Sequence, residues 1–227
     1  MCGRYSFTLP PDAIRELFRV TTALNLRPRY NIAPTQEAPV IGVDEAGARA
    51  LKMYRWGLVP RWSKALSGSA PMINARAESI AEKPAFRDAF RKRRCLVPAD
   101  GFYEWLKDKS AGDRRPWHIF ASDRPAFAFA GIWEAWRDPQ AGPDADLLRS
   151  FAIVTTAANE RIAAIHDRMP VMLRREDEDA WLAADTAPER LQAMLVPYPS
   201  DLTGLHRVDA RVNSVRNDDP DCIRPVD

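Results

Sequence analysis

The sequence of 227 residues contains little cysteine, and its cysteines form no metal-binding pattern. Cys2, Cys95 and Cys222 are odd in number and far apart, and no Cys-x-x-Cys pair occurs. This argues against both a disulfide framework and a zinc cluster. We therefore expect free, reduced thiols, no metal site and no cofactor.

Long apolar runs and an excess of one charge are also missing. No run approaches the roughly 18 residues that would suggest a membrane span, and the polar N-terminus lacks the apolar core of a signal peptide. We therefore expect a cytoplasmic protein without a membrane partner. Lysine and arginine total 33 against 31 for aspartate and glutamate, which gives a net charge of +2. Any binding of nucleic acid must then come from local clusters of arginine.

The hydrophobic fraction of 46% is high enough for a sizeable core. Tyr5, Phe7 and Leu9 alternate with polar residues, which predicts a half-buried strand near the N-terminus. The proline-punctuated stretch 25–39 is typical of a long ordered loop. No internal repeat or linker-like stretch occurs, so the economical interpretation is one domain over residues 1–227. Further strands are predicted at 39–43, 48–55, 95–105 (two strands and a turn), 117–120, 126–133, 151–155 and 205–208, and helices after Pro10 and at 85–93, 159–165, 175–184 and 188–195.

The first residues, Met-Cys-Gly-Arg-Tyr, hold the most reactive pattern. Cys2 is small, so methionine aminopeptidase is expected to remove Met1 and leave an amine and a thiol on adjacent carbons. Their unperturbed pKa values are roughly 7.7–8.0 and 8.5, so a fraction of each is nucleophilic near neutral pH. Such a pair can condense with an aldehyde to an imine and then close a five-membered thiazolidine ring. Gly3 leaves room for a substrate and Arg4 adds a positive charge. A cysteine at position two is, however, more often an accident of translation than a catalyst.

Several polar residues further along could support such chemistry. Asn74, Arg76 and Glu78 alternate, so in an extended segment they would point to one side. Glu104 lies between two aromatic residues, a setting that could desolvate its carboxylate and suit it to acid–base work. An exposed strand glutamate is the alternative, and the motif alone leaves both open. For the basic run 91–94 we favour a solvated helix end over a phosphate site.

Two tryptophans and a histidine complete the candidates. Trp56 has apolar neighbours and is expected to seal the core, whereas Trp62 stands beside Arg61 in a predicted loop and suits base stacking. His166 follows a predicted helix and could carry a proton near neutral pH, with Asp167 as a candidate orienting partner.

Several motifs occur here in one order. They are Met-Cys-Gly-Arg, Arg-Tyr-Asn-Ile-Ala-Pro-Thr, Trp-Gly-Leu-Val-Pro, Ile-Asn-Ala-Arg-Ala-Glu, Pro-Ala-Asp-Gly-Phe-Tyr-Glu-Trp and Ile-His-Asp-Arg-Met-Pro. Together they resemble the SRAP family, the SOS response-associated peptidases now understood as abasic-site processing proteins. The resemblance covers nearly the whole chain, from Cys2 to the Asn-Ser-Val-Arg-Asn segment. It implies an α+β fold, a single β-rich domain with a distorted, barrel-like antiparallel core and peripheral helices.

The resemblance also implies a reaction and a partner. Cys2 would attack the ring-opened aldehyde of an abasic site in single-stranded DNA and form a thiazolidine cross-link that shields the lesion during the DNA damage response. Asn74 would hold the N-terminus and the sugar, Glu104 would act as acid–base catalyst, and His166 would assist ring opening and reversal. We would expect a monomer that associates with the nucleoid when bound to DNA. The implied DNA-binding residues are Gly3, Arg4, Asn31, Pro34, Trp62, Arg76 and Arg168, and the sequence departs from some relatives around 61–71.

Two other interpretations use the same residues. In the first, Cys2 is the nucleophile of an N-terminal-nucleophile peptidase whose α-amine serves as its base. No pro-segment longer than Met1 and no separate peptide-binding pattern support it. In the second, the arginines and tryptophans form a non-catalytic module for single-stranded DNA, which would leave Cys2, Glu104 and His166 unexplained.

Overall fold

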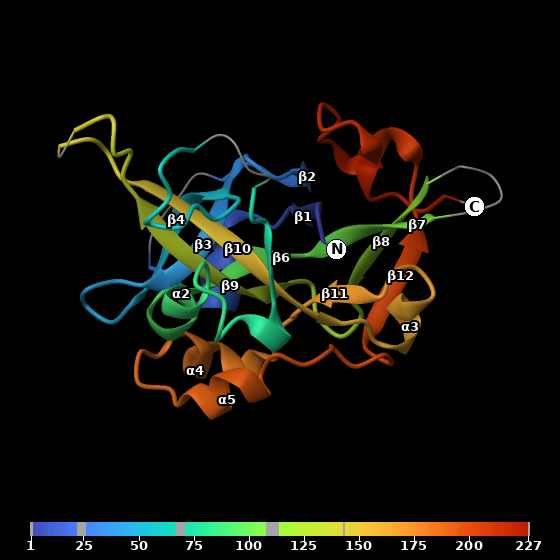
Figure 1. Ribbon diagram of the computed structural model, residues 1–227. Coiled ribbons are helices and arrows are strands. Elements are labelled where there is room, and N and C mark those ends of the chain that lie inside the picture. Colours follow the sequence, from blue (N-terminus) through green and yellow to red (C-terminus); the bar gives the residue numbers. More distant parts are fainter. Residues whose placement is uncertain (1, 22–25, 67–70, 108–113, 143, 227) are drawn as a thin grey trace.

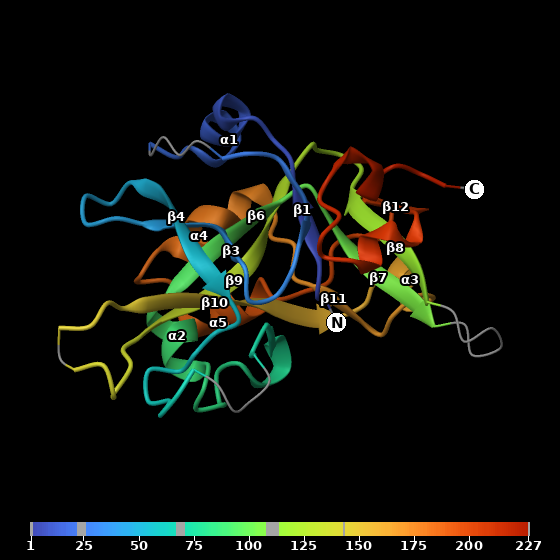
Figure 2. The same cartoon turned by 90° about the horizontal axis from the view of Figure 1, so that it is seen from above.

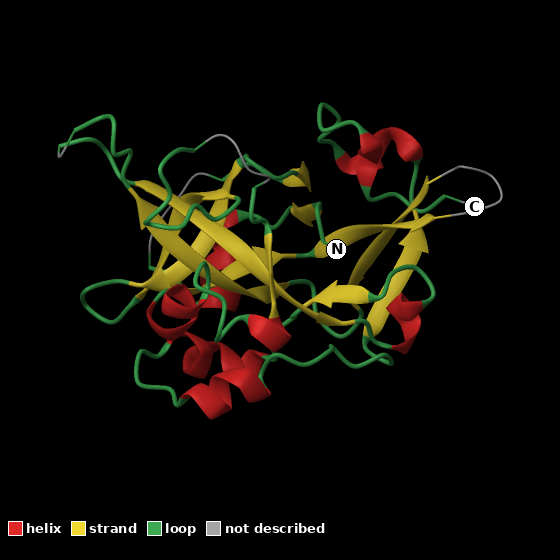
Figure 3. Cartoon of the chain, viewed as in Figure 1, coloured by secondary structure: helices red, strands yellow, loops and turns green. Residues whose placement is uncertain are grey.

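The structure is a computed structural model that describes residues 2–21, 26–66, 71–107, 114–142 and 144–226. The expected removal of Met1 thus falls outside the described residues. Strands dominate, and they form two sheets with short helices around them (Figures 1 and 3). The predicted β-rich α+β class is confirmed. Among the described helices, none is both long and apolar enough to cross a membrane.

The larger sheet closes into a barrel-like ring of five strands. Strand β10 pairs with β4 on one side and with β9 on the other, and the ring continues through β3 and β6. The pairings of β10 with β4 and β5 are parallel, whereas the other named pairings of this sheet are antiparallel. The strands are β3 (Glu37–Val43), β4 (Arg49–Trp56), β6 (Arg94–Ala99), β9 (Phe127–Trp136) and β10 (Leu148–Ala157), with β5 (Asn74–Arg76) and β11 (Arg168–Pro170) attached to β10.

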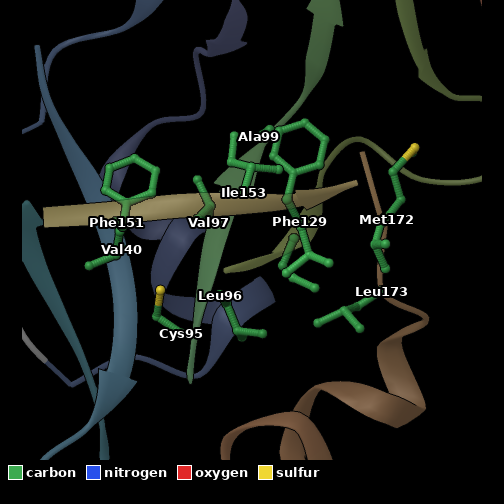
Figure 4. Close-up of a cluster of buried hydrophobic side chains, with 14 of the residues drawn as sticks. Val40, Cys95, Leu96, Val97, Ala99, Phe129, Phe151, Ile153, Met172 and Leu173 are labelled. Carbon is green, nitrogen blue, oxygen red and sulfur yellow. The ribbon is translucent and has the colours of Figure 1, made fainter. Parts of the chain in front are cut away.

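Apolar side chains from these strands fill the core, as Figure 4 shows for Val97, Phe129 and Ile153. Burial of such a side chain is worth roughly 1.5–3 kcal/mol. Trp56 is fully buried and packs edge-on against Tyr5, with ring centroids 5.2 Å apart. The prediction that Trp56 seals the core is confirmed.

The smaller sheet has the strand order β12-β8-β7-β1-β2 and carries the N-terminus. Its edge strand β2 corrects the prediction of an uninterrupted loop over 25–39, of which 25 is not described. The backbone amides of Tyr30 and Asn31 donate to the carboxylate of Asp218, nearly 190 residues away. Because this support comes from a distant residue, the local pattern does not indicate a strand. The strands are β1 (Tyr5–Phe7), β2 (Arg29–Ile32), β7 (Gly101–Lys107), β8 (Arg114–Ala121) and β12 (Thr203–Arg207).

The helices are short, and α2, α4 and α5 lie together on one side of the barrel (Figures 1 and 3). The solvated interpretation of the run 91–94 is wrong for Arg94, which is buried and donates to the carbonyls of Phe90 and Trp181. The helices are α1 (Pro11–Phe18), α2 (Arg87–Lys92), α3 (Glu160–Ala163), α4 (Glu178–Leu182) and α5 (Pro188–Ala193), with 3-10 turns η1 (Ala77–Ser79), η2 (Arg175–Asp177), η3 (Ala210–Asn213) and η4 (Pro220–Cys222).

A turn at Asp100 passes the chain from the barrel strand β6 into β7 of the smaller sheet. The Asp100 carboxylate accepts hydrogen bonds from the Ser6 hydroxyl and from the backbone amide and hydroxyl of Thr8. Gly101 is required here, since a Cβ atom would lie 2.1 Å from Nε2 of His118. The turn thereby fixes β1, and with it the residues that precede β1.

His118 makes the stability of this sheet depend on pH. Burial, and next the charge of His206, lower the pKa of His118 to about 3. The unfolded chain, with a histidine pKa near 6.5, binds the proton first, so stability falls as pH drops from about 6.5 toward 3. Between pH 7 and pH 5 we expect a loss of about 2 kcal/mol in the free energy of unfolding from this group. Urea unfolding at the two pH values measures it, and His118→Gln should remove most of the loss; an equal loss in the variant would refute this assignment.

Candidate active site

Cys2 is buried and lies three residues before the first residue of β1 in the smaller sheet. In Figures 1 and 2 this end of the chain lies beside β11 and the end of β10. Burial, and next the negative charge of Glu104, raise the pKa of the Cys2 thiol well above its usual range. The sulfur is therefore held as a thiol, and it needs a group that takes its proton before it can attack.

Asn74, on β5, fixes the backbone of Cys2. Its amide Nδ2 donates to the carbonyl oxygen of Cys2 at 2.9 Å. Its other polar atom, Oδ1, is buried and has no hydrogen-bond partner among the residues that the structure describes. An unsatisfied buried acceptor costs about 1–3 kcal/mol, so this oxygen marks a place where a donor is expected to bind.

Glu104 comes from β7, the strand that pairs with β1. The register sets Tyr5 opposite Phe102, and the backbone amide of Tyr103 donates to the carbonyl of Arg4 at 2.9 Å. Glu104 is 3% exposed, and its charge acts on the Cys2 thiol. Of the two interpretations left open by the sequence, the buried carboxylate is confirmed and the exposed one is wrong.

Arg4 is held in place by the C-terminal segment. Its Nη1 donates to Oδ1 of Asn31 at 2.7 Å and to the carbonyl of Val212 at 2.8 Å. The guanidinium also lies over the ring of Trp105, 5.9 Å from its centroid. Asn31 is fully buried, and its amide nitrogen donates to three carbonyls of the segment 212–217. In this structure Asn31 supports Arg4 and has no surface of its own to offer to DNA.

Arg76 and Arg168 flank the same residue of β10. Strand β5 pairs Arg76 with Thr155, and Arg168 donates to the carbonyl of Thr155 at 2.6 Å. Arg76 is exposed, whereas Arg168 forms a two-pronged ion pair with Glu78. Glu78 belongs to η1 and so does not continue β5, contrary to the expected extended segment. The ion pair of Arg168 and Glu78 thus lies beside β5, the strand that carries both Asn74 and Arg76.

His166 stands two residues before β11 and close to its predicted partner. Its Nδ1 accepts a hydrogen bond from the backbone amide of Arg168 at 2.9 Å, and the same atom lies 2.9 Å from the Asp167 carboxylate. These two contacts orient the imidazole ring from the residues that follow it in the chain.

Trp62 lies outside this cluster, at a surface cavity of about 330 Å³. Its side chain is 64% exposed, and Thr35 and Met72 line the same cavity. Thr35 follows the half-buried Pro34 and has a φ of 72°, a left-handed conformation that costs a β-branched residue roughly 1–2 kcal/mol. Strain of this kind is concentrated at functional sites. Met72, in the cavity wall, stands two residues before Asn74 in the sequence.

The structure therefore brings together Cys2, Asn74 and Glu104, with Arg76 on the same strand as Asn74 and Arg168 on β11, which also pairs with β10. Sequence reasoning missed the ion pair of Arg168 and the anchoring of Arg4 by the C-terminal segment. Neither had a local signal, because each joins residues at least 90 positions apart. Over the described ranges, no group of three or more His, Cys, Asp or Glu side chains is arranged to hold a metal ion.

Comparison with known proteins agrees with these motifs. A family model described as SOS response associated peptidase (SRAP) matches residues 1–215. Abasic site processing protein YoqW of Bacillus subtilis is 40% identical over 227 aligned residues, which cover 98% of this chain and 99% of the relative. Abasic site processing protein HMCES of Pongo abelii is 30% identical over 275 aligned residues, covering 100% and 77%.

A crystal structure of a protein from Bacteroides thetaiotaomicron has the same fold, with a TM-score of 0.86 at 24% identity over 99% of this chain and 100% of that one. The family model and these relatives each span most of the chain. The chain therefore belongs to the SRAP family.

Proposed function

We propose that this protein captures abasic sites in single-stranded DNA by forming a thiazolidine cross-link through Cys2. The observation that supports this proposal most strongly is the arrangement around Cys2. Asn74 holds the backbone of Cys2 and has a buried, unsatisfied acceptor beside it, and the charge of Glu104 acts on the Cys2 thiol. Several relatives bear the name abasic site processing protein. The single domain over residues 1–227, the monomeric state and the cytoplasmic location are part of this proposal.

The amine and the thiol of Cys2 act in turn. Loss of Met1 converts the amide nitrogen of Cys2 into a primary amine, which can donate to Oδ1 of Asn74. The amine adds to the aldehyde carbon of the opened sugar, and loss of water leaves an imine. The sulfur then adds to that carbon, and the thiol proton passes through Glu104 to the ring nitrogen. His166 serves sugar ring opening and the reverse reaction.

Ring closure by sulfur explains why two nucleophiles are needed. An imine withdraws electrons from the adjacent carbon, which invites β-elimination and breaks the strand. The thiazolidine carbon is saturated, so this route is closed and the lesion is shielded. An abasic sugar also offers an aldehyde without a base, so a confined site admits it and excludes ordinary nucleotides.

The arginines are proposed to bind the strand around the lesion. Arg4, Arg76 and Arg168 would contact phosphates, Gly3 would let the backbone approach, and Trp62 with Pro34 would direct the strand by stacking. Asn31 acts through Arg4. Because the contacts are with phosphates, noncovalent affinity should fall steeply as salt is raised.

The peptidase interpretation has less support in this geometry. The hydrogen bond of the Cys2 sulfur is to the carbonyl of Arg4 at 3.9 Å, which activates no nucleophile. A serine, an aspartate and a histidine do meet nearby, but Ser6 is fully buried and lies between Asp100 and His118. This order is not that of a hydrolytic triad, in which histidine stands in the middle. We assign this group to the anchoring of β1.

The proposal is tested with protein shown by intact mass to lack Met1. It is incubated with a single-stranded oligonucleotide that carries one abasic site, with one that carries a tetrahydrofuran analogue, and with an undamaged strand. A band that survives heat in a denaturing gel is expected only for the abasic strand, since the analogue has no aldehyde. Absence of this band, or its presence on the analogue, would contradict the proposal. Cleavage of a peptide substrate without DNA capture would favour the peptidase.

A further inference from the structure

One ion pair at the site, between Arg168 and Glu78, keeps an arginine from binding phosphate. Arg168 is 15% exposed in its side chain, and it directs Nη1 and Nη2 at the two carboxylate oxygens of Glu78, at 2.5 and 2.9 Å. A two-pronged contact of this kind is also how a guanidinium binds phosphate. Glu78 therefore occupies the face of Arg168 that a phosphate would use.

Of the two partners, Glu78 is the one that is free to leave. Arg168 remains tied to the carbonyl of Thr155 at 2.6 Å, whereas the Glu78 side chain is 56% exposed. Glu78 sits on the three-residue turn η1 and not on a strand. The hydrogen bond from Arg168 lowers the pKa of Glu78, so its carboxylate stays ionised at neutral pH.

We propose that Glu78 is a specificity-determining residue that competes with DNA phosphate for Arg168. This inference rests on the proposed function, because it assumes that Arg168 binds the strand. Any single strand must displace Glu78 before it gains this contact, so its affinity is reduced by the fraction of molecules in which the pair is closed. Undamaged DNA is then released readily, and abasic DNA is retained by the covalent bond.

The adjacent Arg76 makes such competition useful. Arg76 is exposed and pairs with Thr155, the residue whose carbonyl the Arg168 guanidinium contacts. Without Glu78, both arginines would be available to DNA phosphate. Such a site would hold undamaged DNA for longer and delay the search for lesions. Glu78 offsets one of the two charges and does so only while no phosphate is present.

The test is the affinity of Glu78→Gln for an undamaged single-stranded oligonucleotide, measured by fluorescence anisotropy at 100 mM salt. Glutamine keeps the size of the side chain and removes its charge. We expect binding roughly two- to fivefold tighter than for the unmodified protein, in line with the strength of a partly exposed ion pair. Unchanged or weaker binding would overturn the inference, and weaker binding would mean that Glu78 positions Arg168.

Two controls separate this effect from a general change in charge. Glu82→Gln removes the same charge from an exposed residue four positions along and should alter the affinity less than twofold. In an Arg168→Ala background, Glu78→Gln should lose its advantage, since the two residues act as one pair. If the unmodified protein neither binds the strand nor captures the abasic site, the proposed function fails. If it does both and Glu78→Gln binds no tighter, only this inference fails.

Discussion

Replacement of Cys2 with serine should reduce the heat-stable DNA product at least 100-fold while the affinity for undamaged strand changes less than twofold. Serine is small enough for Met1 to be removed, so the α-amine and its proposed hydrogen bond to Oδ1 of Asn74 should be kept. Imine formation therefore continues, but a hydroxyl does not close a stable ring under these conditions. The imine is lost on heating, and no product is seen on a denaturing gel.

Added cyanoborohydride should recover the product for Cys2→Ser, because the reductant converts an imine into a stable amine. The same reagent should change little for the unmodified protein. Cys95→Ala serves as a control, since Cys95 is buried in the barrel and should leave capture intact. A heat-stable product from Cys2→Ser without reductant would contradict the proposal, because it would show that the stable product does not require ring closure by sulfur. A failure of Cys2→Ser with reductant would show that the amine is not the first nucleophile.

The catalytic arrangement could be predicted from the sequence to the extent that it depends on local pattern. Trp56 was assigned to the core by its apolar neighbours, and Glu104 was recognised as a candidate because two aromatic residues flank it. The register of β1 against β7, which brings Glu104 to Cys2, is a matter of pairing between strands almost 100 residues apart. No periodicity within either segment specifies it.

The parts that escaped prediction all depend on single long-range polar contacts. The local pattern predicts a loop where strand β2 lies, because the outer edge of β2 is satisfied by one carboxylate, Asp218, and not by another strand. Asn31 was expected at the DNA, but it is buried between Arg4 and the C-terminal segment. Hydrophobic periodicity carries no information on such contacts, which form only when the chain has folded.

These contacts also explain why the site is built from both ends of the chain. Arg4 and Asn31 are tied to residues 212–217, and Asp218 is tied to Arg29. The charge of Arg4 is thereby fixed in position two residues from the proposed nucleophile, Cys2. A preorganised charge loses no energy to reorientation when substrate binds, which is the main electrostatic advantage of an enzyme site over water.

The second large effect is expected for Glu104→Gln, and its direction separates two roles for this residue. The negative charge of Glu104 raises the pKa of the Cys2 thiol. If Glu104 acted only through this charge, its removal would make the thiol more acidic and speed ring closure. If Glu104 carries the proton, its removal slows capture, typically by 10²–10⁴-fold. We expect capture in a single turnover at pH 7 to be about 100-fold slower.

The measurement is the rate of appearance of the cross-linked band with protein in excess over the abasic strand. Affinity for the undamaged strand and the melting temperature are followed in parallel, because Glu104 is buried and its replacement can affect folding. Glu104→Asp keeps a carboxylate at a shorter reach and should recover part of the rate, which a purely structural role would not predict. Faster capture by Glu104→Gln would assign Glu104 to holding the thiol protonated until substrate arrives. The proton would then have to leave the sulfur by another path, and His166, which is oriented by Asp167 and the amide of Arg168, would be the residue to replace next.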